Sequence, residues 1–104
     1  MPAEQKVQPS RDRAFREHVR EQVCGFWGTD YGGSCEGPTQ AAHIPPRGEG
    51  RKAKKASDYF CGPLCRHHHQ QAHGGHLSDE ELRLAQVHAW RILVRWLDAR
   101  GGPR

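Results

Sequence analysis

The stretch CGPLCRHHHQQAH, residues 61–73, holds two cysteines and four histidines within thirteen positions. Thiolates and imidazoles are the ligands that zinc and related ions prefer in proteins. A proline near the start of the stretch and two glycines directly after it are typical of a short helix, which we expect over residues 63–73. The stretch therefore predicts a helix that carries metal ligands.

Two different metal sites are predicted on this one helix. His69 and His73 are four positions apart and share a helical face, so both imidazoles can bind one ion. Cys65 and His68 have the C-x-x-H spacing of a zinc knuckle. Because His68 and His69 are adjacent, they point about 100° apart around the helix. The crowding of ligands thus corresponds to two sites rather than one.

The first predicted site is a closed structural zinc site, which needs four ligands. Cys65 and His68 supply two of them, and Cys35 is the best third ligand because it lies just before a short predicted strand. Cys24 is our choice for the fourth ligand, since it opens the same loop region. Cys61 is the alternative, although a cysteine in an apolar segment such as YFCGPL commonly serves as a small buried hydrophobe.

The second predicted site, at His69 and His73, is an open one. Two imidazoles leave coordination positions for water and a phosphate oxygen, which is what a hydrolytic ion requires. His43, in the segment AAHIPPR, ends a predicted strand that faces the helix, and it is the candidate base for the attacking water. A lone histidine is more often an ordinary surface or core residue, so this role depends on geometry.

Length and composition indicate a small domain that needs a staple. The chain has 104 residues, 35% of them hydrophobic, so we expect one domain with a thin core that a metal would stabilise. Residues 1–9 are predicted to be disordered, residues 10–100 to form the domain and residues 101–104 a tail. A net charge of +4 suits a polyanionic partner but is weak support for one.

The start of the chain bears on the compartment. The first fifteen residues contain no apolar run, and no stretch of the chain is long enough to cross a membrane. We therefore expect a cytoplasmic protein whose thiols stay reduced, which favours metal binding over disulfides.

Four further elements are predicted around the central helix. A helix over residues 10–23, capped by Ser10, would bury an apolar stripe, and strands are expected over residues 39–44 and 59–62. A final helix would begin after Ser78 and end near residue 100, with Glu81 at the capping-box position. The stripe of the first helix comprises Ala14, Phe15, Val19 and Val23, and the buried face of the last comprises Leu82, Ala85, Trp90, Leu93, Val94 and Leu97.

The segment AAHI, the glycine-rich basic loop after it and the run KASDYFCGPLCRHHHQQAH together resemble the HNH endonucleases of the ββα-metal type. The resemblance is to small phage and prophage HNH proteins, including the RecA-dependent recombination-enhancement nuclease, and it covers residues 35–76. It implies an α+β fold in which a zinc-stapled ββα-metal core is flanked by an N-terminal and a C-terminal helix. It also implies DNA as the substrate.

The resemblance assigns roles to individual residues. His43 matches the general base, and Asp58 lies near the family's central Asn or Asp, which braces the loop and orients the base. His69 and His73 match the ligands of the catalytic divalent ion, which in the family is Mg²⁺, Mn²⁺, Ni²⁺ or Zn²⁺. Basic residues of the intervening loop would follow the DNA backbone, namely Arg47, Arg51, Lys52, Lys54 and Lys55.

The chain departs from the family pattern at two points. Ala42 stands where many relatives have an Asp or His that ligates the ion, so either two protein ligands and waters hold the ion or His43 itself binds it. Cys35 has no second cysteine at the usual knuckle spacing, so either the distant Cys24 completes the zinc site or the zinc has only three protein ligands.

These observations predict a metal-dependent DNA endonuclease or nickase with little sequence specificity. The alternative is a zinc-stabilised DNA-binding or partner-binding module with a decayed active site, which the alanine before His43 favours. By analogy alone, a recombinase filament or phage DNA-processing proteins would be further partners. The chain would be a monomer, or a dimer through the last helix and its Trp96.

Overall fold

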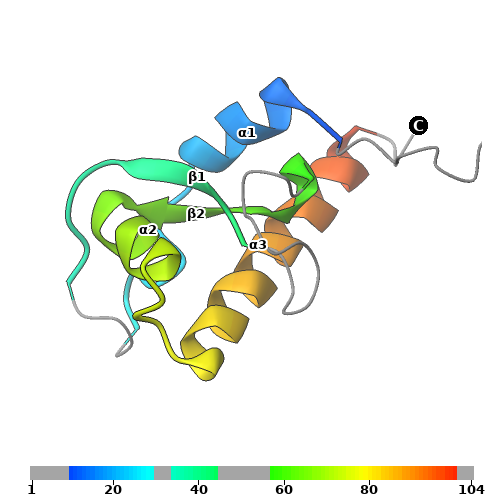
Figure 1. Cartoon of the computed structure of the whole chain (residues 1–104). Coiled ribbons are helices and arrows are strands. Elements are labelled where there is room, and N and C mark those ends of the chain that lie inside the picture. Colours follow the sequence, from blue (N-terminus) through cyan, green and yellow to red (C-terminus); the bar gives the residue numbers. More distant parts are fainter. Residues whose placement is uncertain (1–9, 30–33, 45–56, 101–104) are drawn as a thin grey trace, which may run out of the picture.

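The computed structural model describes residues 10–29, 34–44 and 57–100. An antiparallel pair of strands carries three α-helices around it (Figure 1). The elements in chain order are α1 (Arg13–Arg20), β1 (Thr39–His43), the 3-10 turn η2 (Asp58–Phe60), β2 (Cys61–Cys65), α2 (Arg66–His73) and α3 (Asp79–Ala99). The predicted α+β class is confirmed. The residues predicted as a disordered N-terminus, a tail and a DNA-contacting loop lie outside the described residues.

The two strands pair from Thr39 opposite Cys65 to His43 opposite Cys61. Because side chains alternate across a strand, β1 serves two apolar clusters, with Ala42 in one and Ala41 against the other. The first cluster comprises Cys24, Phe26, Ala42, Ile44, Leu64, Cys65, Leu77 and Ala85. The second comprises Phe15, Val19, Cys61 and Ile92. The small core is thus split by the hairpin.

The hairpin corrects two predicted boundaries. The helix expected from Pro63 begins at Arg66, because Pro63 is paired with Ala41 inside β2. Cys65 caps this helix, its sulfur accepting the backbone N–H of His68. The strand expected over residues 59–62 was also misplaced, since residues 58–60 form η2 and β2 runs from 61 to 65.

The first helix is shorter than predicted. It begins after Asp12, whose side chain accepts the N–H of Phe15, and not after Ser10. Phe15 and Val19 are buried as expected. Ala14 is exposed, and Val23 lies beyond the end of the helix and is exposed as well. The helix therefore contributes two large side chains to the second cluster.

The last helix has the predicted start and a different buried face. Ser78 and Glu81 form the predicted capping box. The buried residues are Ala85, Ala89 and Ile92, whereas Trp90 and Val94 are exposed, so those two predictions are wrong. The reason is the close approach of β2, where a Cβ on Gly62 would lie 2.7 Å from the Ala89 Cβ. Only a small-residue face of α3 fits against this glycine.

None of the described helices combines the length and apolar character that a membrane crossing requires.

Candidate metal centre and histidine site

Four predicted zinc ligands come together in the first cluster. The sulfur or ring-nitrogen atoms of Cys24, Cys35, Cys65 and His68 all lie within 4.8 Å of one another. The three sulfurs are 3.4, 3.7 and 3.1 Å from His68 Nδ1, in that order. Ligand atoms about 2.0–2.3 Å from a tetrahedral zinc ion are roughly 3.5 Å apart. The four residues could therefore hold a structural metal such as zinc.

Backbone N–H groups point at the sulfurs of this cluster. Cys65 Sγ lies 3.4 Å from the backbone nitrogens of Glu36 and His68, and Cys24 Sγ lies 3.5 Å from that of Phe26. Burial works against a charged thiolate at Cys65, but the N–H groups of His68 and Glu36, together with the thiols of Cys24 and Cys35, outweigh it and hold the pKa of that thiol below its usual value. Such donors stabilise the thiolate form, in which cysteine binds metal.

The donor set fits a cation for a second reason. Burial, together with the neighbouring thiols of Cys24 and Cys65, raises the pKa of Cys35 to about 12. Three sulfurs packed this closely cannot all ionise unless a positive charge lies between them. A dication supplies that charge, and a Cys₃His set is a standard closed zinc shell.

Two chain segments build the cluster. Cys24 and Cys35 flank the loop region between α1 and β1, whereas Cys65 and His68 belong to the junction of β2 and α2. His68 is fully buried and its ring lies 4.7 Å from that of Phe26. The alternative ligand, Cys61, lies at the other end of β2 in the second cluster. The cluster thus ties the region after α1 to the metal-ligand helix.

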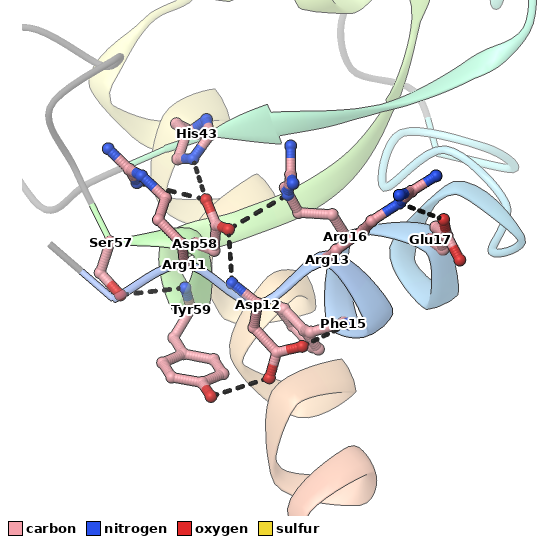
Figure 2. Close-up of polar contacts among 10 residues, drawn as sticks. All are labelled: Arg11, Asp12, Arg13, Phe15, Arg16, Glu17, His43, Ser57, Asp58 and Tyr59. Atoms are coloured by element: carbon pink, nitrogen blue, oxygen red, sulfur yellow. Dashed lines mark hydrogen bonds and ion pairs between the residues drawn. The ribbon is translucent and has the colours of Figure 1, made fainter.

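His43 and Asp58 form a hydrogen-bonded pair beside α1 (Figure 2). His43 Nε2 lies 2.9 Å from Asp58 Oδ1. A carboxylate only accepts hydrogen bonds, so the proton lies on Nε2 and the lone pair is on Nδ1. Asp58 is 1% exposed, whereas the side chain of His43 is 20% exposed. The imidazole is therefore held from the protein side and reaches solvent.

Asp58 is also the anchor of the N-terminal segment. Its Oδ2 accepts the backbone N–H of Asp12 at 2.7 Å, and its two oxygens pair with Arg11 at 3.3 Å and Arg16 at 3.1 Å (Figure 2). Burial raises the pKa of this carboxyl, but the Asp12 N–H, His43 and Arg16 together hold it below its usual value. Asp58 is thus an ionised, buried hub between η2, β1 and α1.

Replacing Asp58 with asparagine is expected to remove part of the pH dependence of stability. The folded-state pKa of Asp58 is below the ordinary 3.8, so its ionised form stabilises the fold above that pH, and this contribution is lost as the pH falls through the folded-state value. At neutral pH the substitution should cost about 1.5–3 kcal/mol, the typical loss of a charged hydrogen bond. Urea unfolding of both proteins from neutral to acidic pH, with the zinc content followed at each pH, measures the difference. That difference should shrink in acid, and a constant difference would contradict the assignment.

His69 and His73 lie together on α2. Their Nε2 atoms are 3.2 Å apart, and His69 Nδ1 lies 2.7 Å from Gln40 Oε1 on β1. Because the amide oxygen accepts, Nδ1 carries the proton and the Nε2 lone pair of His69 faces His73. Burial, then the charges of His73 and His43, lower the pKa of His69. Two imidazoles with converging ring nitrogens can bind a divalent ion.

Ala42 does not contribute to this histidine pair. It is fully buried in the first cluster, against Leu64 and its neighbours. The alanine before His43 therefore belongs to the core. In the described part of the chain, the residues assigned to the ion are the two histidines of α2.

Several contacts at the site were not predicted. The roles of Gln40, Arg16 and Asp12 went unrecognised, since each acts through a partner more than twenty residues away. The role of Gln40 could have been inferred from the alternation of β1. Side chains two residues apart in a strand share a face, so Gln40 lies on the same face as the buried Ala42. His88, which was not singled out from the sequence, is half-buried near Gly25.

No family model, characterised protein or solved structure matches the chain.

Proposed function

We propose that this protein is a metal-dependent DNA endonuclease or nickase of the HNH type. The observation that carries the proposal is that an oriented single histidine and a converging pair of histidines lie on neighbouring elements. His43 ends β1 with its orientation set by Asp58, and His69 and His73 converge on α2. Gln40 links β1 to His69, and the charge of His43 is close enough to lower the pKa of His69. The order β1, β2, α2 with its cysteine cluster agrees with a ββα-metal core.

The proposed chemistry assigns one task to each group. His43 accepts a proton from water at Nδ1, because Nε2 is engaged by Asp58. Asp58 holds the ring in this tautomer and stabilises the imidazolium that forms, as a carboxylate does behind any catalytic histidine. His69 and His73 would hold a divalent ion, which when bound polarises a phosphate and stabilises the leaving oxygen. Imidazole ligands favour Ni²⁺ or Zn²⁺ over Mg²⁺.

A second candidate function is a zinc-stabilised module that binds DNA or a partner without cleaving. The observation in its favour is the fully buried Ala42, which provides no third ligand. The oxygens of Asp58 are engaged by His43 and two arginines and do not replace it. A site with only two protein ligands would hold its ion weakly.

Supercoiled plasmid separates the two functions. We expect the protein to nick it with added Mg²⁺, Mn²⁺ or Ni²⁺ and to be inactive without them. Loss of a residue behind a metal ligand typically costs about 10- to 100-fold in metal affinity. Replacing His69 with alanine removes one of two ligands themselves, so the ion concentration for half-maximal nicking should rise by at least that factor. Zinc content should stay unchanged, since the cysteine cluster is separate. If the fully zinc-loaded protein fails to nick the plasmid with any of the added ions, the nuclease proposal is overturned and the binding module is favoured.

A further inference from the structure

The large exposed hydrophobic side chains of the described residues lie around one region. They are Val23 and Trp27, which are 61% and 68% exposed, and Trp90 and Val94, which are 42% and 56% exposed. The first two belong to the loop after α1 and the others to α3. Single apolar residues on a surface are ordinary, but a gathered set usually marks an interaction site.

Two adjoining hollows, which we together call the groove, lie beside these side chains. Its first part has a volume of about 570 Å³ and lies between the loop after α1 and the first half of α3, with Val23 and Trp27 in its wall. Its second part, of about 380 Å³, lies along α3 beside Trp90 and Val94. Val87 and Arg91 line both parts, so the two parts adjoin each other on α3.

The spacing of the α3 residues suits a helical partner. Val87, Trp90, Arg91 and Val94 follow the i, i+3, i+4, i+7 pattern of a single helical face. This face is distinct from the one formed by Ala85, Ala89 and Ile92, which packs in the core. A stripe of this kind beside an apolar groove is the arrangement that receives an amphipathic helix.

The charges around the groove select the partner. Arg83 and Arg91 line its first part and Arg95 its second, with Glu80 as the acidic residue of the lining. If a second copy of α3 occupied the groove, these arginines would face arginines of the other copy, and the like charges would repel. The groove lining is mostly apolar, which suits the apolar side chains of a helix better than the charged backbone of a nucleic acid. The rim is complementary to acidic side chains that flank an apolar stripe.

From this groove and its basic rim we infer that the protein binds an acidic amphipathic helix of a partner protein. The partner's apolar side chains enter beside Trp27 and Trp90, and its carboxylates pair with Arg91 and Arg95. The chain does not itself supply such a segment in residues 45–56 or 101–104, whose sequences are basic. This inference does not depend on nuclease activity.

A random peptide library displayed on phage, selected against the zinc-loaded full chain, tests the inference. We expect the enriched peptides to carry Asp or Glu around apolar residues at helical spacing. A synthetic enriched peptide should change the tryptophan fluorescence on binding. Its Kd should rise about tenfold or more with Arg91→Glu and with Val94→Asp, since each change costs a central contact.

Arg13→Glu is the matched control, because Arg13 is an 84% exposed side chain on α1 that does not line the groove. It should leave the Kd unchanged. Enriched peptides without the acidic and apolar pattern, or equal affinity for Arg91→Glu and wild type, would overturn the inference. So would a dimer in sedimentation that Val94→Asp dissociates, or oligonucleotide binding in the groove that Arg91→Glu abolishes.

Discussion

Replacing Cys65 with alanine is expected to release the bound metal and unfold the domain. Cys65 supplies one of four clustered ligand atoms, is 2% exposed and caps α2 through its sulfur. Structural zinc contributes apparent binding free energies of about 10–16 kcal/mol in small zinc domains. A small domain has a total stability of about 5–15 kcal/mol, so losing this contribution leaves little net stability. Zinc content of the purified protein and thermal unfolding followed by circular dichroism measure both effects.

Cys61→Ala is the matched control for this experiment. Cys61 is a buried thiol at the opposite end of the same strand, outside the four-residue cluster. Its replacement should retain one zinc per chain and a cooperative transition, with the modest loss that a small cavity causes. If Cys65→Ala kept its zinc and its melting temperature, the proposed ligand set would be wrong. If Cys61→Ala lost its zinc instead, Cys61 rather than Cys24 would be the fourth ligand.

Replacing His43 with alanine is expected to abolish plasmid nicking while the fold and the zinc remain. A positioned general base contributes about 10²- to 10⁴-fold to a rate, and His43 is the imidazole that Asp58 orients toward solvent. The four residues that could hold zinc belong to the other cluster, so zinc content should be that of wild type. Nicking rates at saturating metal, with circular dichroism as a check of folding, give the comparison.

The control for His43 is the exposed His76→Ala, which removes an imidazole after the end of α2. Its nicking rate should equal that of wild type. Equal rates for His43→Ala and wild type would remove His43 as the base. A raised metal requirement with an unchanged maximal rate would instead make His43 a ligand of the ion.

The ligands that structure brings together were predictable because their signals are local. The spacing of Cys65 and His68, and of His69 and His73, follows from the geometry of one helix. The choice of Cys24 over Cys61 rested on position and on the apolar neighbours of Cys61, and the structure brings Cys24 into the cluster. The start of α2 was not predictable in this way, because a proline suits an edge strand as well as a first helical turn.

The ion pairs of Asp58 with residues of the N-terminal segment could not be predicted from the sequence. Asp58 pairs with Arg11 and Arg16, more than forty positions away, and no periodicity links them. The rotation of α3 was missed for a related reason. Apolar residues occur on more than one face of that helix, and the close approach at Gly62 selects the alanine face for the core. Trp90 and Val94 are left outside as a result.

The cluster's division between two segments determines the order in which the protein can be assembled. Cys24 and Cys35 are synthesised well before Cys65 and His68, with β1 in between. A growing chain therefore carries two unpaired ligands until residue 68 has emerged, and α3, which covers β2, comes later still. We therefore expect the cluster to form late and slowly, because contacts that join residues far apart in the chain are slow to form. Fragments released before that point would be open to proteolysis and to binding metal in the wrong way.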